Sequence, residues 1–237
     1  MVVDIVFQDV TVILMKLLDW QKILNNKYNY LLAVEILIVL AFPFLQLTKT
    51  DFPLTSMLLL LAITPALYVA LTLKRFMAII MIGLLAFILN IIASYQLVPQ
   101  FENILLCLLA LYAIYFLFTI VVLIRKISSR KVITSDTVKG GISVYFLIGL
   151  FWSALYMILN IIHPGALTVI NDKTDYFYFS FTTLTTLGYG DITPTISCAK
   201  IMAIMEAFTG QIYIAIFIAQ LIGLSIAQKL QENKPQS

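Results

Sequence analysis

The stretch TLTTLGYGDITP, residues 183–194, places two glycines, a tyrosine and an aspartate between hydrophobic segments. Of the 237 residues in the chain, 62% are hydrophobic and only 11% are charged. Soluble domains carry about 25% charged residues, so this composition predicts a membrane protein with several spans. In such a protein, irregular backbone at membrane depth is tolerated only where it is buried in protein or lines water. The stretch therefore predicts a re-entrant segment that lines a pore.

Six apolar segments are long enough to cross a bilayer as helices, since a span needs about 20 residues. A shorter amphipathic run, 176–186, lies between the fifth and the sixth. We therefore expect an all-α membrane protein with six transmembrane helices plus a re-entrant pore helix and selectivity filter. The six expected spans are 28–48, 54–73, 76–101, 103–124, 142–162 and 201–228.

The basic residues predict the orientation of these spans. With the N-terminus in the cytoplasm, twelve of the 15 lysines and arginines lie inside, and only Lys49, Lys173 and Lys200 lie outside. This positive-inside bias predicts cytoplasmic N- and C-termini and an outward-opening filter. It also accounts for the net charge of +3 without a nucleic-acid partner.

The chain is expected to divide into five parts. Residues 1–27 have apolar positions at helical spacing and predict an amphipathic interfacial helix. Residues 28–124 form a four-helix peripheral domain, and 142–228 form the pore domain. The basic linker 125–141, bent at Gly140-Gly141, either binds anionic lipid through 125–139 or connects passively. Residues 229–237 form a short cytoplasmic tail.

The filter segment needs carbonyl oxygens that all point at one axis. Carbonyls of an ordinary strand alternate in direction, so residues must alternate into conformations with positive φ, which Gly188 and Gly190 adopt without steric cost. Thr186 adds a hydroxyl at the inner end, and Tyr189 is expected to point away from the axis. Stacked rings of oxygens replace the hydration shell of an ion. One chain supplies one such segment, so we expect a homotetramer.

The run Thr186-Leu187-Gly188-Tyr189-Gly190-Asp191 resembles the TVGYGD filter of tetrameric potassium channels, with Leu187 in place of valine. Thr185 and Pro194 also match, and 142–228 is similar to the pore module of that family. The resemblance implies K⁺ held at Thr186, Leu187, Gly188 and Tyr189, with no other cofactor. It also implies an inner-helix hinge at Gly210. The compact chain is similar to bacterial members, which implies the bacterial inner membrane.

The expected fourth span, 103–124, carries no arginine or lysine. Voltage sensing needs several charges, because each contributes about 2.3 kcal/mol per 100 mV. We therefore predict a channel that is not strongly voltage-gated. On the sixth span a stripe of isoleucines either forms a hydrophobic gate or packs against the fifth helix. Its members are Ile214, Ile218, Ile222 and Ile226.

Polar residues around the stretch are expected to support the filter. Glu206 lies inside the sixth span, where an acid is costly, and we expect it to brace the pore helix near Thr182 or Thr183. Asp175 is expected to cap that helix. Glu35, in the first span, is expected to snorkel to the surface. The expected filter-support residues are Thr182, Thr183, Thr185, Asp191 and Glu206.

One histidine and two isolated cysteines argue against an enzyme. Two alternatives to a potassium channel remain open. One is a non-selective cation channel, and the other is a silent subunit that assembles with or regulates other channels.

Overall fold

The computed structural model describes residues 27–47, 77, 80–85, 87–88, 101–130, 132–170 and 173–232. Within these ranges the protein is helical and has no strand; its only β-structure is an isolated antiparallel bridge between Leu167 and Pro194. The helices are α3 (Lys27–Leu47), α6 (Phe101–Ser128), α7 (Ser135–Ile162), α8 (Lys173–Leu184) and α9 (Ser197–Glu232).

Three helices in this part of the chain are long and apolar enough to cross a membrane, namely Leu105–Ser128, Ser135–Ile162 and Ser197–Leu230. They coincide with the fourth, fifth and sixth predicted spans, and α3 coincides with the first. The predicted interfacial helix (except its last residue), the second span and residues 233–237 lie outside the described residues. The third span is described only at a few helical positions between 77 and 88.

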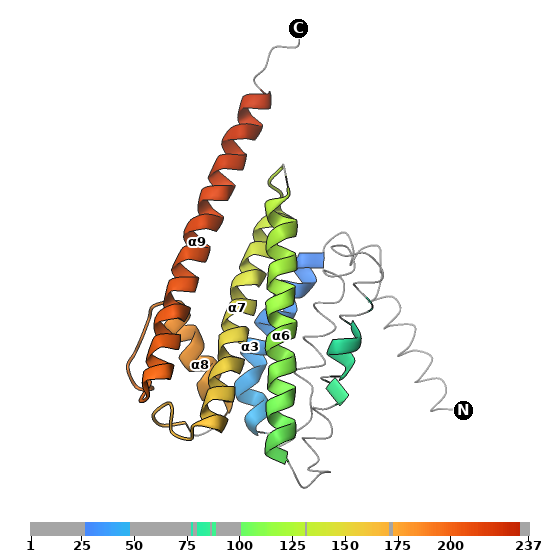
Figure 1. Ribbon diagram of the computed structural model, residues 1–237. Helices are drawn as coiled ribbons and strands as arrows, with labels where there is room; N and C mark the ends of the chain where they lie inside the picture. The colour runs from blue at the N-terminus through green and yellow to red at the C-terminus, as the bar shows by residue number, and fades with distance from the viewer. Residues whose placement is uncertain are drawn as a thin grey trace, which may run out of the picture.

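Helix α7 is the centre of the arrangement and contacts α3, α6, α8 and α9 (Figure 1). One buried cluster joins α3, α6 and α7 around the fully buried side chains Leu31, Leu123 and Leu147. A second cluster, around Tyr156 and Phe179, joins α7, α8 and the start of α9. Helices α8 and α9 are therefore fixed to α3 and α6 mainly through α7.

The segment between α6 and α7 is shorter than the predicted linker 125–141. Helix α6 continues to Ser128, and α7 begins at Ser135 behind the N-cap Thr134, which pairs with Thr137 in a capping box. The predicted bend at Gly140-Gly141 is wrong, because both glycines lie inside α7 and are buried. A Cβ at residue 141 would lie 1.9 Å from Cζ of Phe217. The ring of Phe217 occupies the space that a side chain at residue 141 would take, so this residue is a close helix contact.

Glu35 does not snorkel, contrary to the expectation. Its side chain is only 2% exposed, because α3 packs directly on α7 at this point. The polar neighbour is the buried Ser143 of α7. Neither carboxyl oxygen of Glu35 nor Oγ of Ser143 has a hydrogen-bond partner within the described residues, so packing holds α3 on α7.

Helix α8 begins three residues before the predicted start and ends at Leu184 rather than 186. Asp175 lies in its first turn instead of at the N-cap. The 12 residues of α8 span about 18 Å, roughly half the thickness of a bilayer core. In Figure 1 this short helix lies against the lower end of α7, beside the start of α9. This is the placement expected of a re-entrant helix.

Helix α9 has 36 residues and is about 54 Å long, which exceeds the hydrocarbon core of a bilayer. Its C-terminal end extends beyond the ends of α6 and α7 (Figure 1). Only 6% of its most apolar window is buried within the chain, against 50% for α7. The described residues of the chain therefore leave one long apolar face of α9 without cover.

Candidate functional site

The segment from Thr186 to Gly190 leaves the end of α8 with an alternating backbone. Positive φ angles occur at Thr186 (58°), Gly188 (52°) and Gly190 (83°), and at neither residue between them. The predicted use of both glycines is thus confirmed. Alternation of this kind turns successive peptide units toward the same side of the strand, which an extended strand does not do.

Thr186 is the third member of this alternation, and its positive φ was not predicted. A β-branched residue with positive φ is an outlier, since left-handed backbone costs about 1–2 kcal/mol for residues other than glycine. The backbone N–H of Thr186 is held by the carbonyl of Thr183 at 2.9 Å. Such strain persists only where the surroundings impose it, and it concentrates at functional sites.

The carbonyl of Thr182, in the last turn of α8, anchors the segment. It accepts hydrogen bonds from the N–H groups of Leu187 at 2.8 Å and Gly188 at 3.1 Å. Helix C-terminal carbonyls lack partners within the helix, so these bonds satisfy one of them. The C-terminal end of α8 also carries the negative end of the helix dipole. The segment therefore begins at a place that favours a cation.

Tyr178 links α8 to the outer end of the segment. Its hydroxyl donates to Asp191 Oδ2 at 2.7 Å, and its ring is stacked on Tyr189, with 6.3 Å between centroids and 2° between planes. The hydrogen bond lowers the pKa of Asp191 and raises the pKa of Tyr178 to about 12. Asp191 and Tyr189 thus both contact Tyr178 of α8. Sequence reasoning missed Tyr178.

Glu206 contacts α8 through Ser180 rather than through Thr182 or Thr183. Its Oε1 lies 2.5 Å from Ser180 Oγ, and its Oε2 accepts a 2.7 Å hydrogen bond from the hydroxyl of Tyr156. The carboxyl is fully buried. It therefore joins α7, α8 and α9 at one point. Tyr156 and Ser180 gave no signal in the sequence, because their spacing from Glu206 has no short-range pattern.

The serine in this cluster has only one proton to donate. Ser180 Oγ lies 2.8 Å from the carbonyl of Gly149, which can only accept. If the serine donates there, its bond with Glu206 needs a proton from the carboxyl group. The geometry therefore fits a neutral carboxylic acid, which avoids burying an uncompensated charge.

Gly210 lies where α9 passes closest to the end of α8. A Cβ at this position would lie 2.4 Å from the carbonyl oxygen of Leu184. The same carbonyl accepts a 3.2 Å hydrogen bond from the hydroxyl of Tyr145. Helix α9 runs without interruption through Gly210, so close packing explains the glycine here, and its action as a hinge stays a prediction.

Gln211 follows Gly210 and reaches the inner end of the segment. Its Nε2 lies 3.4 Å from Thr186 Oγ1, and that hydroxyl in turn donates to the carbonyl of Thr185 at 2.6 Å. Sequence reasoning missed this residue. The available signal was an amide in a largely apolar span, directly beside a glycine.

The isoleucine stripe does not pack against α7. Its four side chains are 37–56% exposed, whereas Tyr213 and Phe217 face α7 instead. The second of the two sequence interpretations is therefore wrong for this chain. The filter segment is also uncovered, with Leu187 at 56% and Tyr189 at 68% exposure. The described part of one chain therefore covers neither the isoleucine stripe nor the side chains of Leu187 and Tyr189.

Thr185 completes the set of predicted support residues. Its hydroxyl donates to the carbonyl of Phe181 at 2.6 Å, one turn back in α8. Carbonyls of Thr182, Thr183 and Thr185 thus accept hydrogen bonds from the segment itself, whereas Asp191 and Glu206 bond to side chains of α7 and α8. In the described residues no group of histidines, cysteines and acids has the arrangement of a metal site.

Comparison with known proteins places this geometry in context. A family model described as "Ion channel" matches residues 133–225, which contain α7, α8 and most of α9. The chain is 39% identical over 66 residues to Two-pore potassium channel 4 of Arabidopsis thaliana, covering 28% of this chain and 22% of that protein. No solved structure matches.

Two further relatives match the chain over short stretches. Potassium channel K2 of Plasmodium berghei is 36% identical over 87 residues, which is 34% of this chain and 6% of that protein. Two pore potassium channel a of Oryza sativa subsp. japonica is 33% identical over 78 residues, which is 33% of this chain and 21% of that protein. The chain spans about a fifth or less of the length of these relatives.

Proposed function

We propose that the protein is a potassium-selective channel in which residues 186–190 of four copies form the filter. The observation that carries this proposal is the alternation of positive φ at Thr186, Gly188 and Gly190. A backbone of this kind points its carbonyl oxygens at one axis. These oxygens replace the water molecules that surround K⁺ in solution. The names of the matched relatives, all potassium channels, support the same ion.

Four copies are required because one segment surrounds only one side of an ion. The uncovered face of α9 and the exposed Leu187 and Tyr189 supply apolar surface for contact between copies. Exposed apolar area of this extent marks an interaction surface or a lipid contact. In the proposed tetramer, the stripe from Ile214 to Ile226 faces the central cavity and gates it by excluding water.

Conduction is proposed to be independent of voltage. The basic residues of α6 are confined to its last turn, at Arg125 and Lys126. Charges at the surface move through little of the membrane field, so they contribute little energy to opening. The peripheral helices, fixed to α7 by their shared core, are proposed to set its position rather than to sense voltage.

The test is the reversal potential of liposomes that contain only this protein, under two-ion conditions with K⁺ on one side and Na⁺ on the other. A reversal potential shifted to the K⁺ equilibrium value supports the proposal. A reversal potential near zero indicates a non-selective channel. No current indicates a silent subunit or another function, and contradicts conduction by this chain alone.

A matched variant shows whether the current passes through the proposed filter. Gly188→Ala adds a methyl group that meets no atom within 4 Å in the chain, so its effect is confined to the positive φ. We expect this variant to fold and to lose K⁺ selectivity or current. Gly223→Ala, on the distal part of α9, also meets no atom within 4 Å and has no positive φ. It serves as the control and is expected to conduct as the parent does.

A further inference from the structure

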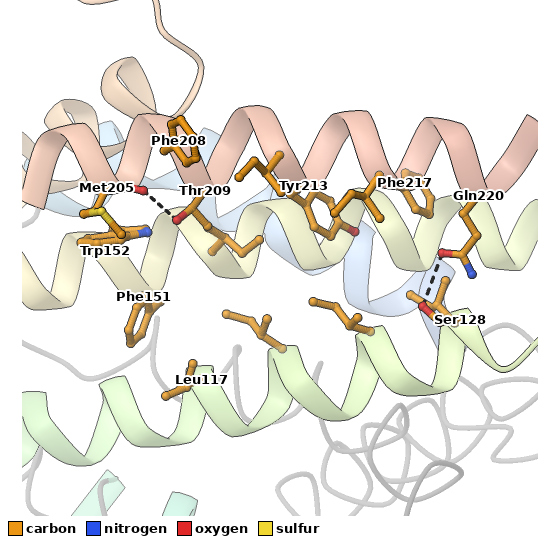
Figure 2. Close-up of a pocket in the computed structure, with 16 residues that line it drawn as sticks. Leu117, Ser128, Phe151, Trp152, Met205, Phe208, Thr209, Tyr213, Phe217 and Gln220 are labelled. Atoms are coloured by element: carbon orange, nitrogen blue, oxygen red, sulfur yellow. Dashed lines mark hydrogen bonds between the residues drawn. The ribbon is translucent and has the colours of Figure 1, made fainter.

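A groove of about 560 Å³ runs between α6 and α9, with α7 as its floor (Figure 2). Along α9 it extends from Met205 to Gln220, which corresponds to about 22 Å of helix. At one end Ser128 of α6 donates a 3.4 Å hydrogen bond to Gln220 and bridges the two helices. The groove lies between two of the helices that are apolar enough to span a membrane, so it faces the depth of the hydrocarbon core.

The lining of the groove favours a hydrocarbon occupant. Most of its side chains are aliphatic or aromatic, among them Leu117, Phe151 and Trp152. The hydroxyls in the lining already donate within the chain. Thr209 donates to the carbonyl of Met205 at 2.7 Å, and Tyr213 donates to the carbonyl of Gly141 at 2.7 Å. A polar ligand would therefore gain few hydrogen bonds here.

Basic side chains near the end of the groove at Ser128 and Gln220 favour an occupant with an anionic headgroup. Arg125 and Lys126 lie in the last turn of α6, three and two residues before Ser128. The exposed Arg130 follows the helix. Asp136, in the first turn of α7, is the one acid in the described residues between 125 and 139. This end is therefore net positive at the depth where lipid headgroups lie.

We propose that the groove binds an acyl chain of an anionic phospholipid, whose headgroup phosphate pairs with Arg125 and Lys126. Basic side chains close to a span attract anionic headgroups, and arginine pairs with phosphate through two parallel hydrogen bonds. A helix of a second copy fits the groove less well. The three described helices that are long enough to span a membrane offer only Asp136 and Glu206 as acids, and both Glu206 and Glu35 of α3 are buried.

Trp152 gives a direct measurement because it lines the groove. The chain has one other tryptophan, Trp20, so Trp20→Phe leaves Trp152 as the sole tryptophan fluorophore. The variant is reconstituted in phosphatidylcholine liposomes that contain a minor fraction of acyl-brominated phosphatidylglycerol or, in parallel, acyl-brominated phosphatidylcholine. Bromine quenches tryptophan on contact, so the quenching reports which lipid occupies the groove.

The proposal predicts several-fold stronger quenching per mole by the brominated phosphatidylglycerol. Equal quenching by the two lipids would overturn the headgroup assignment. Absence of quenching by either lipid would show that another part of the assembly, such as a second copy, fills the groove, and would also overturn it. The measurement needs no ion current, so its failure is distinguishable from failure of the proposed function.

Single-charge variants separate a bound lipid from general attraction to the surface. Arg125→Gln is expected to reduce the preference for the anionic lipid several-fold. Lys229→Gln removes one charge from the last turn of α9, away from the groove lining, and is expected to leave the preference unchanged. Equal loss in the two variants would contradict a headgroup site at Arg125.

Discussion

Tyr178 and Asp191 are joined by a 2.7 Å hydrogen bond that ties the middle of α8 to the residue directly after the filter segment. The same tyrosine ring is stacked on Tyr189, so one residue of the pore helix holds the outer half of the segment. The segment itself makes no backbone ladder with another strand in the described residues. Its conformation therefore depends on side-chain contacts of this kind.

Tyr178→Phe removes the hydroxyl and keeps the ring that stacks on Tyr189. We expect K⁺ selectivity to be retained, with a several-fold faster decline of current during continuous conduction, because the outer end of the segment is less well held. Macroscopic recordings from liposomes measure this decline. Asp191→Asn is the reciprocal change. If both variants decline at the parental rate, the bond does not stabilise the filter.

The same pair predicts how current depends on pH. The hydrogen bond lowers the pKa of Asp191 below its ordinary value of 3.8, so the stabilising interaction is present above that value and is lost only in stronger acid. The pKa of Tyr178 is raised to about 12, so the bond is kept below the ordinary value of 10.0 and is lost as pH rises through about 12. We expect the rate of decline to be constant between about pH 5 and 9. A rate of current decline that changes with pH between about 5 and 9 would contradict the prediction.

Removal of the Glu206 side chain is expected to destabilise the protein. Glu206→Ala leaves the hydroxyl of Tyr156 without its buried partner, at a cost of about 1–3 kcal/mol, whereas Ser180 keeps its bond to the carbonyl of Gly149. Glu206→Gln still donates one hydrogen bond and accepts one, so it is expected to be much milder. Thermal unfolding in detergent measures both variants. Similar losses for alanine and glutamine would argue against the neutral acid.

The contact between Glu206 and Tyr156 is tested by a double-mutant cycle. Tyr156→Phe and Glu206→Gln are combined, and we expect a coupling free energy of about 0.5–3 kcal/mol, as for residues in one hydrogen-bonded network. Additive effects of the two changes would mean that the 2.7 Å bond contributes no stability of its own.

Two glycines of α9 should respond in opposite directions to alanine. In a helix interior alanine is favoured over glycine by about 1 kcal/mol, so Gly223→Ala, which meets no neighbouring atom, is expected to stabilise the protein. At Gly210 the new Cβ would lie 2.4 Å from the Leu184 carbonyl oxygen, and overpacking costs about 1–3 kcal/mol. The clash outweighs the propensity, so Gly210→Ala lowers the thermal unfolding temperature. Stabilisation by both changes would contradict this packing.

Gln211 is expected to affect how ions enter the filter from the cavity. Gln211→Leu removes the amide 3.4 Å from Thr186 Oγ1, which leaves more of that oxygen free to face an ion. We expect several-fold tighter block by Ba²⁺ applied at the inner side, with an unchanged reversal potential. Gln220→Leu is the matched control, because Gln220 contacts Ser128 and not the filter. Equal effects of the two variants would exclude a local action of Gln211.

The sequence by itself predicted the four described long helices and the positive φ angles at Gly188 and Gly190. Apolar runs of about 20 residues dictate spans because a bilayer core offers no partner for exposed backbone groups. The alternating glycines at 188 and 190 predicted the positive φ angles, because only glycine adopts them without cost. These features depend on residues close together in the chain.

Only the tertiary structure decided which distant residues meet. The Tyr156–Glu206–Ser180 cluster, the burial of Glu35 and the positive φ of Thr186 all depend on how α3, α7, α8 and α9 pack. The glycines at 140 and 141 were read as a bend because glycine is permissive in isolation. Packing against Phe217 made residue 141 a close helix contact instead. Hydrophobic periodicity fixes which face of a helix is apolar, but not which neighbour covers it, since that depends on the shapes of all the surfaces together.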